Sequence, residues 1–131
     1  MGTQAIINLK HGTTLAPFSV YMHYDGYNEA VYAFYNATYD FFKSEGGIDF
    51  SYFQARFLQT IGHFFGGTSS VGVLPYTPQG NGRRLYTLDI AGPCARFEDS
   101  EAYSYIYNQC MEYLQSTTYD ARKKSRALDS V

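Results

Sequence analysis

The chain has 131 residues, of which 45% are hydrophobic and 17% charged, so it can bury enough apolar surface for one folded core. Its formal net charge is −2: residues 1–119 carry six Lys/Arg against ten Asp/Glu, and residues 120–131 carry four against two. Direct binding of duplex nucleic acid is not expected, because an acidic body cannot neutralise many phosphates. The sequence predicts a single domain over residues 1–119, followed by a basic, frayed C-terminal tail over residues 120–131.

Targeting and cysteine signals point to a reducing compartment. The N-terminus lacks a charged region followed by an apolar core, so no signal peptide is expected. No apolar run approaches the length of a membrane span. Cys94 and Cys110 are too far apart in sequence for a CxxC unit, and two cysteines do not make a disulfide framework. We therefore expect a cytosolic protein with reduced thiols, no membrane contact, no metal and no cofactor.

The first half of the chain predicts two strands and two helices. Residues 4–10 are largely apolar, and side chains of residues 18–24 alternate between apolar and more polar ones. The two segments flank a turn, which is typical of an antiparallel pair of strands. Helical spacing follows from Asn28, a candidate N-cap, and stops before two glycines at 46–47. Ser51 and Gln54 have capping-box spacing, which predicts a second helix that ends at Gly66.

The second half predicts another hairpin and a third helix. Residues 71–74 and 84–90 have strand character and flank a strong turn signal at Gly80-Asn81-Gly82. Ser100 then opens a helix whose apolar stripe is Tyr103, Ile106, Tyr107, Cys110 and Leu114. The order ββααβ(β)α indicates an α+β fold: a small antiparallel sheet of two hairpins with three helices packed on one face.

His23 and Asp25 are the weak catalytic candidates. On an ideal strand they share side-chain parity, and a carboxylate beside a histidine could support acid/base chemistry in hydrolysis. The plainer alternative is that Asp25 makes the turn and His23 lies on the polar strand face. No third ligand or nucleophile accompanies them, and nothing in the spacing around Cys94 supports a cysteine nucleophile.

Binding is favoured by an excess of aromatic residues, 14 Tyr and 10 Phe, because tyrosine is enriched at interfaces as well as at core edges. Two arginines at the second hairpin tip could hold a phosphate or carboxylate, although a solvated turn is the simpler interpretation. The candidate binding residues are Tyr24, Asp25, Tyr27, Glu29, Arg83, Arg84 and Tyr86.

Two segments carry a resemblance to a known family. Met1-Gly2-Thr3-Gln4-Ala5 and His23-Tyr24-Asp25-Gly26-Tyr27-Asn28-Glu29 are similar to segments of a family of small phage and prophage proteins. Members typically begin Met-Gly-Thr-Arg-Ala and carry His-x-Asp-Gly-Tyr-Pro-Glu after the second strand. Here Gln4 stands for the usual Arg and Asn28 for the usual Pro, so any role of those positions in relatives is not carried over.

The resemblance implies a small accessory protein of a mobile element, acting in the cytosol of the host cell. We expect a non-enzymatic anti-defence protein that acts by stoichiometric binding, with a CRISPR–Cas effector as the first expected partner. An alternative is a sponge for a cyclic or ADP-ribose-type nucleotide, held by Arg83, Arg84 and tyrosines in a possible homo-oligomer. A small hydrolase using His23 and Asp25 is a further alternative.

Overall fold

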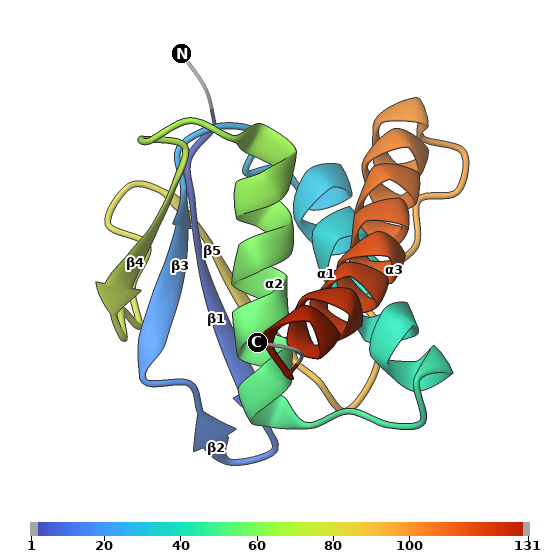
Figure 1. Cartoon of the computed structure of the whole chain (residues 1–131). Coiled ribbons are helices and arrows are strands. Elements are labelled where there is room, and N and C mark those ends of the chain that lie inside the picture. The colour runs from blue at the N-terminus through green and yellow to red at the C-terminus, as the bar shows by residue number, and fades with distance from the viewer. Residues whose placement is uncertain (1–2, 130–131) are drawn as a thin grey trace.

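The computed structural model describes residues 3–129, with side chains described up to residue 117. One sheet forms one layer, and all three helices pack on the same face of it (Figure 1). The elements are β1 (Ala5–His11), β2 (Thr14–Leu15), β3 (Phe18–Met22), α1 (Asn28–Ser44), α2 (Phe50–Phe65), β4 (Val71–Pro75), β5 (Arg84–Asp89) and α3 (Glu101–Asp129). The predicted α+β class and element order are confirmed.

The centre of the sheet is β1. It pairs antiparallel with β2 and β3 on one side and parallel with β5 on the other, while β4 adds antiparallel to β3. The first predicted hairpin is therefore confirmed, but the second is wrong, because β3 and β1 lie between β4 and β5. The predicted turn does form: Asn81 and Gly82 have φ of 52° and 87°, and the Arg83 N–H donates to the Gly80 carbonyl at 3.0 Å.

The segment between β4 and β5 crosses the sheet face opposite the helices, and buried polar groups hold it there. The Asn8 side chain donates to the Thr77 carbonyl at 2.9 Å, and the Thr77 N–H donates to the Ser19 hydroxyl at 2.8 Å. The Ser19 hydroxyl in turn donates to the Asn8 side-chain oxygen. This three-residue contact anchors the crossing, which explains why the turn does not close a local hairpin.

Helix α1 lies at the centre of the helical layer and is buried almost all round, beyond the single stripe expected from the sequence. Its N-cap is Tyr27, without a side-chain cap. The expected cap, Asn28, instead accepts a hydrogen bond from the Tyr86 hydroxyl at 2.9 Å. Helix α2 is capped by Asp49 rather than by Ser51, because the Asp49 carboxylate accepts from the N–H groups of Ser51 and Tyr52.

Helix α3 buries the stripe that the sequence predicts: Tyr103, Ile106, Cys110 and Leu114 are buried, and Tyr107 is half-buried. The helix is continuous to Asp129, past the expected domain end at residue 119. The predicted basic tail, residues 120–131, has side chains that lie outside the part of the chain whose side chains the structure describes. In the described part of the chain, none of the helices is both long enough and apolar enough to cross a membrane.

Candidate functional site

The segment between β3 and α1 is a tight turn pressed against β1. Its Asp25 has φ of 56°, a left-handed conformation that Asp tolerates better than most residues. Gly26 donates its N–H to the Thr3 carbonyl at 2.8 Å and accepts from the Tyr86 hydroxyl at 2.8 Å. These bonds fix where α1 begins relative to the sheet.

His23 and Asp25 do not form a dyad. Strand β3 ends at Met22, so the strand parity expected for the two side chains no longer applies. The His23 Nδ1 atom instead lies 3.0 Å from the Tyr21 hydroxyl and 3.4 Å from the Gln4 side-chain amide. Over the described residues, no hydrogen bond or ion pair joins His23 to Asp25, so no geometry supports general acid/base catalysis by this pair.

Arg83 and Arg84 point to opposite faces of the sheet. The Arg83 guanidinium stacks 5.2 Å from the centre of the Tyr21 ring, on the face away from the helices, and bonds Gln4 at 3.2 Å. Arg84 lies in register with the buried Ala5 on the helix side, and its guanidinium is 3.5 Å from the Asn28 side chain. A clamp that uses both guanidinium groups on one ligand is therefore not assembled within the chain.

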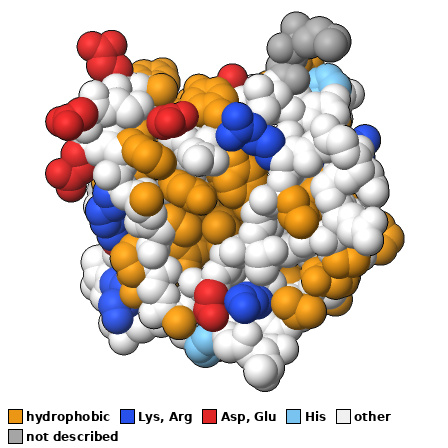
Figure 2. Space-filling view, turned by 180° about the vertical axis from the view of Figure 1, so that it is seen from behind, with side chains coloured by type: hydrophobic (Ala, Val, Ile, Leu, Met, Phe, Trp, Pro, Cys, Tyr) orange, Lys and Arg blue, Asp and Glu red, His pale blue; other side chains and the backbone are white. Residues whose placement is uncertain are grey.

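Two predicted binding residues come together with a segment that contains none of the predicted site residues. Tyr27 and Glu29, from the start of α1, line an open pocket of about 550 Å³ with Phe97, Glu98 and Asp99. We call these five residues the acidic–aromatic patch. In Figure 2, Asp and Glu side chains gather on one side of the molecule, next to a band of hydrophobic side chains.

Local helix chemistry explains why carboxylates collect here. Helices α1 and α3 begin at the same end of the molecule (Figure 1), and the positive end of a helix dipole favours acidic residues. Glu29 and Glu101 stand in the two first turns, and Ser100 accepts a hydrogen bond from the Tyr103 N–H at 3.2 Å. Partial burial, together with the charges of Asp25 and Glu29, raises the pKa of Tyr27, so its hydroxyl stays protonated.

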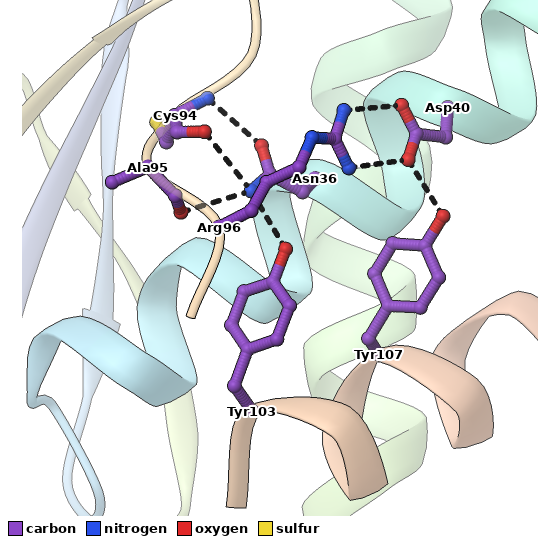
Figure 3. A network of polar contacts seen from close by, with 7 residues as sticks. All are labelled: Asn36, Asp40, Cys94, Ala95, Arg96, Tyr103 and Tyr107. Atoms are coloured by element: carbon purple, nitrogen blue, oxygen red, sulfur yellow. Dashed lines mark hydrogen bonds and ion pairs between the residues drawn. The ribbon is translucent and has the colours of Figure 1, made fainter. Parts of the chain in front are cut away.

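A polar network holds the segment that carries Phe97 and Glu98 (Figure 3). Asn36, fully buried on α1, accepts from the Cys94 N–H at 2.8 Å and donates to the Tyr103 hydroxyl at 2.9 Å. Its amide also reaches the carbonyls of Cys94 and Ala95 at 3.3 and 3.2 Å. One side chain thus joins α1, the segment before α3 and α3 itself.

A second contact of the same network is an ion pair. Arg96 binds the Asp40 carboxylate through two hydrogen bonds of 2.8 and 2.9 Å, and the Tyr107 hydroxyl donates to it at 2.6 Å. Partial burial alone would raise the pKa of Asp40, but these hydrogen bonds and the Arg96 charge lower it overall. Burial and the bond to Asp40 raise the pKa of Tyr107 to about 12.

The lowered pKa of Asp40 predicts an acid-dependent loss of stability. A carboxyl whose pKa is lower when folded adds stability above its unfolded pKa, about 4, and loses it as the pH falls through the folded pKa. We expect wild type to exceed Asp40→Asn in free energy of unfolding at pH 6, with the gap shrinking below pH 4. Urea denaturation across this pH range measures it, and a gap that does not change with pH would contradict the assignment.

The two thiols are poor nucleophiles at neutral pH. Burial raises the pKa of Cys94 to about 11 and that of Cys110 to about 12, so both remain protonated. Cys110 packs in the core, as the sequence predicts. Among the side chains that the structure describes, no three of His, Cys, Asp or Glu are grouped so that they could hold a metal ion.

Comparison with known proteins gives no relative: no protein-family model, curated protein or solved structure matches the chain. Phe97, Glu98 and Asp99 are patch residues that were not predicted from the sequence. Their signal was visible as an acidic run immediately before the third helix. This run lies beside Tyr27 and Glu29 because of the way α1 packs against α3. The spacing of residues in the sequence does not predict that packing.

Proposed function

We propose that the chain is a phage- or mobile-element-encoded anti-defence protein that acts by stoichiometric binding, with a CRISPR–Cas effector as its first target. The observation that supports this proposal is the acidic–aromatic patch. Its carboxylates present a surface complementary to the basic groove in which an effector holds nucleic acid. Tyr27 and Phe97 add rings of the kind that anchor protein interfaces.

The fixed backbone beneath the patch also supports a binding role. Asn36 and the Asp40–Arg96 pair attach the segment before α3 to α1, so the backbone that carries Glu98 and Asp99 is in place before any partner arrives. A surface that is ordered in advance loses less conformational entropy on binding. The same carboxylates disfavour phosphate ligands at this pocket, and the Arg96 guanidinium that also lines it is already paired with Asp40. We therefore place protein binding ahead of nucleotide sequestration here.

Charge reversal tests the proposal. The double variant Glu98→Lys, Asp99→Lys should lose inhibition in a panel of purified Cas effectors assayed for target cleavage, because it opposes the effector's basic groove. We expect the concentration for half-inhibition to rise about 100-fold, as for loss of two complementary charges at roughly 1.4 kcal/mol each.

The matched control reverses exposed carboxylates elsewhere. Glu45→Lys, Glu112→Lys changes the net charge by the same amount, at exposed positions on α3 and after α1 that lie outside the patch. It should inhibit like wild type. Equal loss in both double variants would show that net charge matters rather than the patch, and inhibition of no effector by wild type would reject the proposed target.

A further inference from the structure

Among the described residues, strand β5 has no partner strand on the side away from β1, and its backbone is free of bonds there at Leu85 and Thr87. Its even-numbered residues form the backbone hydrogen bonds to β1. The Arg84 N–H donates to the Gln4 carbonyl at 3.1 Å, and, just past the end of β5, the Ile90 N–H donates to the Lys10 carbonyl at 2.9 Å. By the alternation of a parallel ladder, the N–H and C=O groups of Leu85 and Thr87 point away from β1. Within the part of the chain that the structure describes, no further backbone bond involves either residue.

The other edge of the sheet is protected against pairing, which makes β5 the exception. In β4 the even-numbered residues form the backbone hydrogen bonds to β3. The bond from the Tyr76 N–H to the Pro17 carbonyl extends this alternation one residue beyond β4. Pro75 therefore sits at an outward position, where it removes a donor from the free edge, a common protection of edge strands. The β5 sequence, Arg-Leu-Tyr-Thr-Leu-Asp, contains no proline.

We propose that β5 pairs antiparallel with β5 of a second copy of this chain, with Tyr86 opposite Tyr86 across a two-fold axis. Only outward-pointing residues can exchange backbone bonds, which places Leu85 opposite Thr87 of the second copy. This register also sets Arg83 opposite Asp89 of the second copy, at both ends of the ladder. The two side chains belong to the same sheet face, away from the helices, so opposite charges meet. The Asp89 Oδ1 atom already accepts from the N–H groups of Gly12 and Ala91, so the second carboxylate oxygen is the one placed to receive the Arg83 guanidinium.

Charge selects this register over its neighbours. A shift of one strand by two residues places Arg83 opposite Thr87, or Leu85 opposite Asp89, and both ion pairs are lost. Opposite charges directly across two strands contribute roughly 0.2–1 kcal/mol each. The proposed pairing also covers Leu85, whose side chain is 42% exposed in the single chain.

Aromatic side chains connect this edge to the acidic–aromatic patch. Tyr32 lies edge-on to Tyr86, with ring centres 5.9 Å apart, and stacks on Phe97 at 6.0 Å. Figure 2 looks onto this side of the molecule and shows hydrophobic side chains across its middle. Glu29 of the acidic–aromatic patch follows Asn28, which contacts Arg84 at one end of β5. Antiparallel pairing therefore puts the two patches at opposite ends of the dimer, where both stay open.

Sedimentation of the full chain at concentrations up to about 1 mM, the weak end of specific association, tests the pairing. Arg83→Asp and Asp89→Arg should each weaken dimerisation about tenfold, because each turns two attractive pairs into repulsive ones. The combination Arg83→Asp, Asp89→Arg restores both pairs in reversed order and should recover wild-type association. Failure of the combination to recover it would overturn the register.

A second variant addresses the backbone bonds. Thr87→Pro removes an outward N–H, whereas Thr87→Val changes the side chain and keeps the donor. The proline variant should be monomeric while the valine variant dimerises, with folding of both checked by circular dichroism. If the proline variant does not fold, the charge variants at Arg83 and Asp89 alone test the proposed pairing. A wild-type mass of 14.8 kDa at every concentration would overturn the proposal.

Discussion

Replacing Asn36 by alanine should lower the free energy of unfolding by about 3 kcal/mol, because buried partners lose their hydrogen bonds together. Asn36 is 0% exposed and joins Cys94, Ala95 and Tyr103. A methyl group satisfies none of them, and water has little access to the site. Urea denaturation of the full chain, followed by circular dichroism, measures the loss.

Asn108→Ala is the matched control for this variant. Asn108 is exposed on α3, so its replacement should change the free energy of unfolding by less than about 0.5 kcal/mol. A loss below about 1 kcal/mol for Asn36→Ala would mean that the network is replaced by other bonds. The network could not then be what fixes the segment before α3.

Gly26→Ala should destabilise the fold by about 3 kcal/mol, as expected for overpacking against atoms that cannot move aside. An added Cβ atom would lie 2.6 Å from the Ala5 Cβ atom and 2.9 Å from backbone atoms of Gln4 and Thr3. All three belong to the beginning of β1 or the residues just before it. The turn would have to move away from the sheet, which would break the bond from the Tyr86 hydroxyl to the Gly26 carbonyl.

Gly62→Ala is the control of opposite sign. Gly62 lies within α2, and an added Cβ atom there meets nothing within 4 Å apart from the neighbouring backbone of its own helix. Alanine favours the helix by up to about 1 kcal/mol over glycine, so this variant should gain stability in the same denaturation assay. A Gly26→Ala protein as stable as wild type would show that the turn is not held against β1.

The elements of this fold could be predicted from sequence because their signals are local. Alternation marks Phe18, Val20 and Met22 as the core-facing side of β3, and 3.6-residue spacing marks the stripe of α3. The pairing of β5 could not be predicted in the same way. The Gly80-Asn81-Gly82 turn favours a hairpin, but bonds among Asn8, Ser19 and Thr77 draw the chain across the sheet, and such contacts have no local signature.

The same distinction applies to the candidate site. Tyr27 and Glu29 follow from the signals of a turn and a helix start, and the structure places them in one pocket. Phe97 and Glu98 join them because Asn36 fixes the segment before α3, a contact between residues far apart in the sequence. Arg83 and Arg84 were expected to act together, but consecutive residues at the start of a strand face opposite sides of the sheet.

The proposed function requires the acidic–aromatic patch to bind a defence effector at a fixed ratio. The most direct measurement is a calorimetric titration of the wild-type chain into an effector from the panel, at two salt concentrations. We expect saturation at a simple whole-number ratio, an affinity that weakens as salt rises, and loss of binding for Glu98→Lys, Asp99→Lys. Binding that ignores both salt and this double variant would contradict the proposed function.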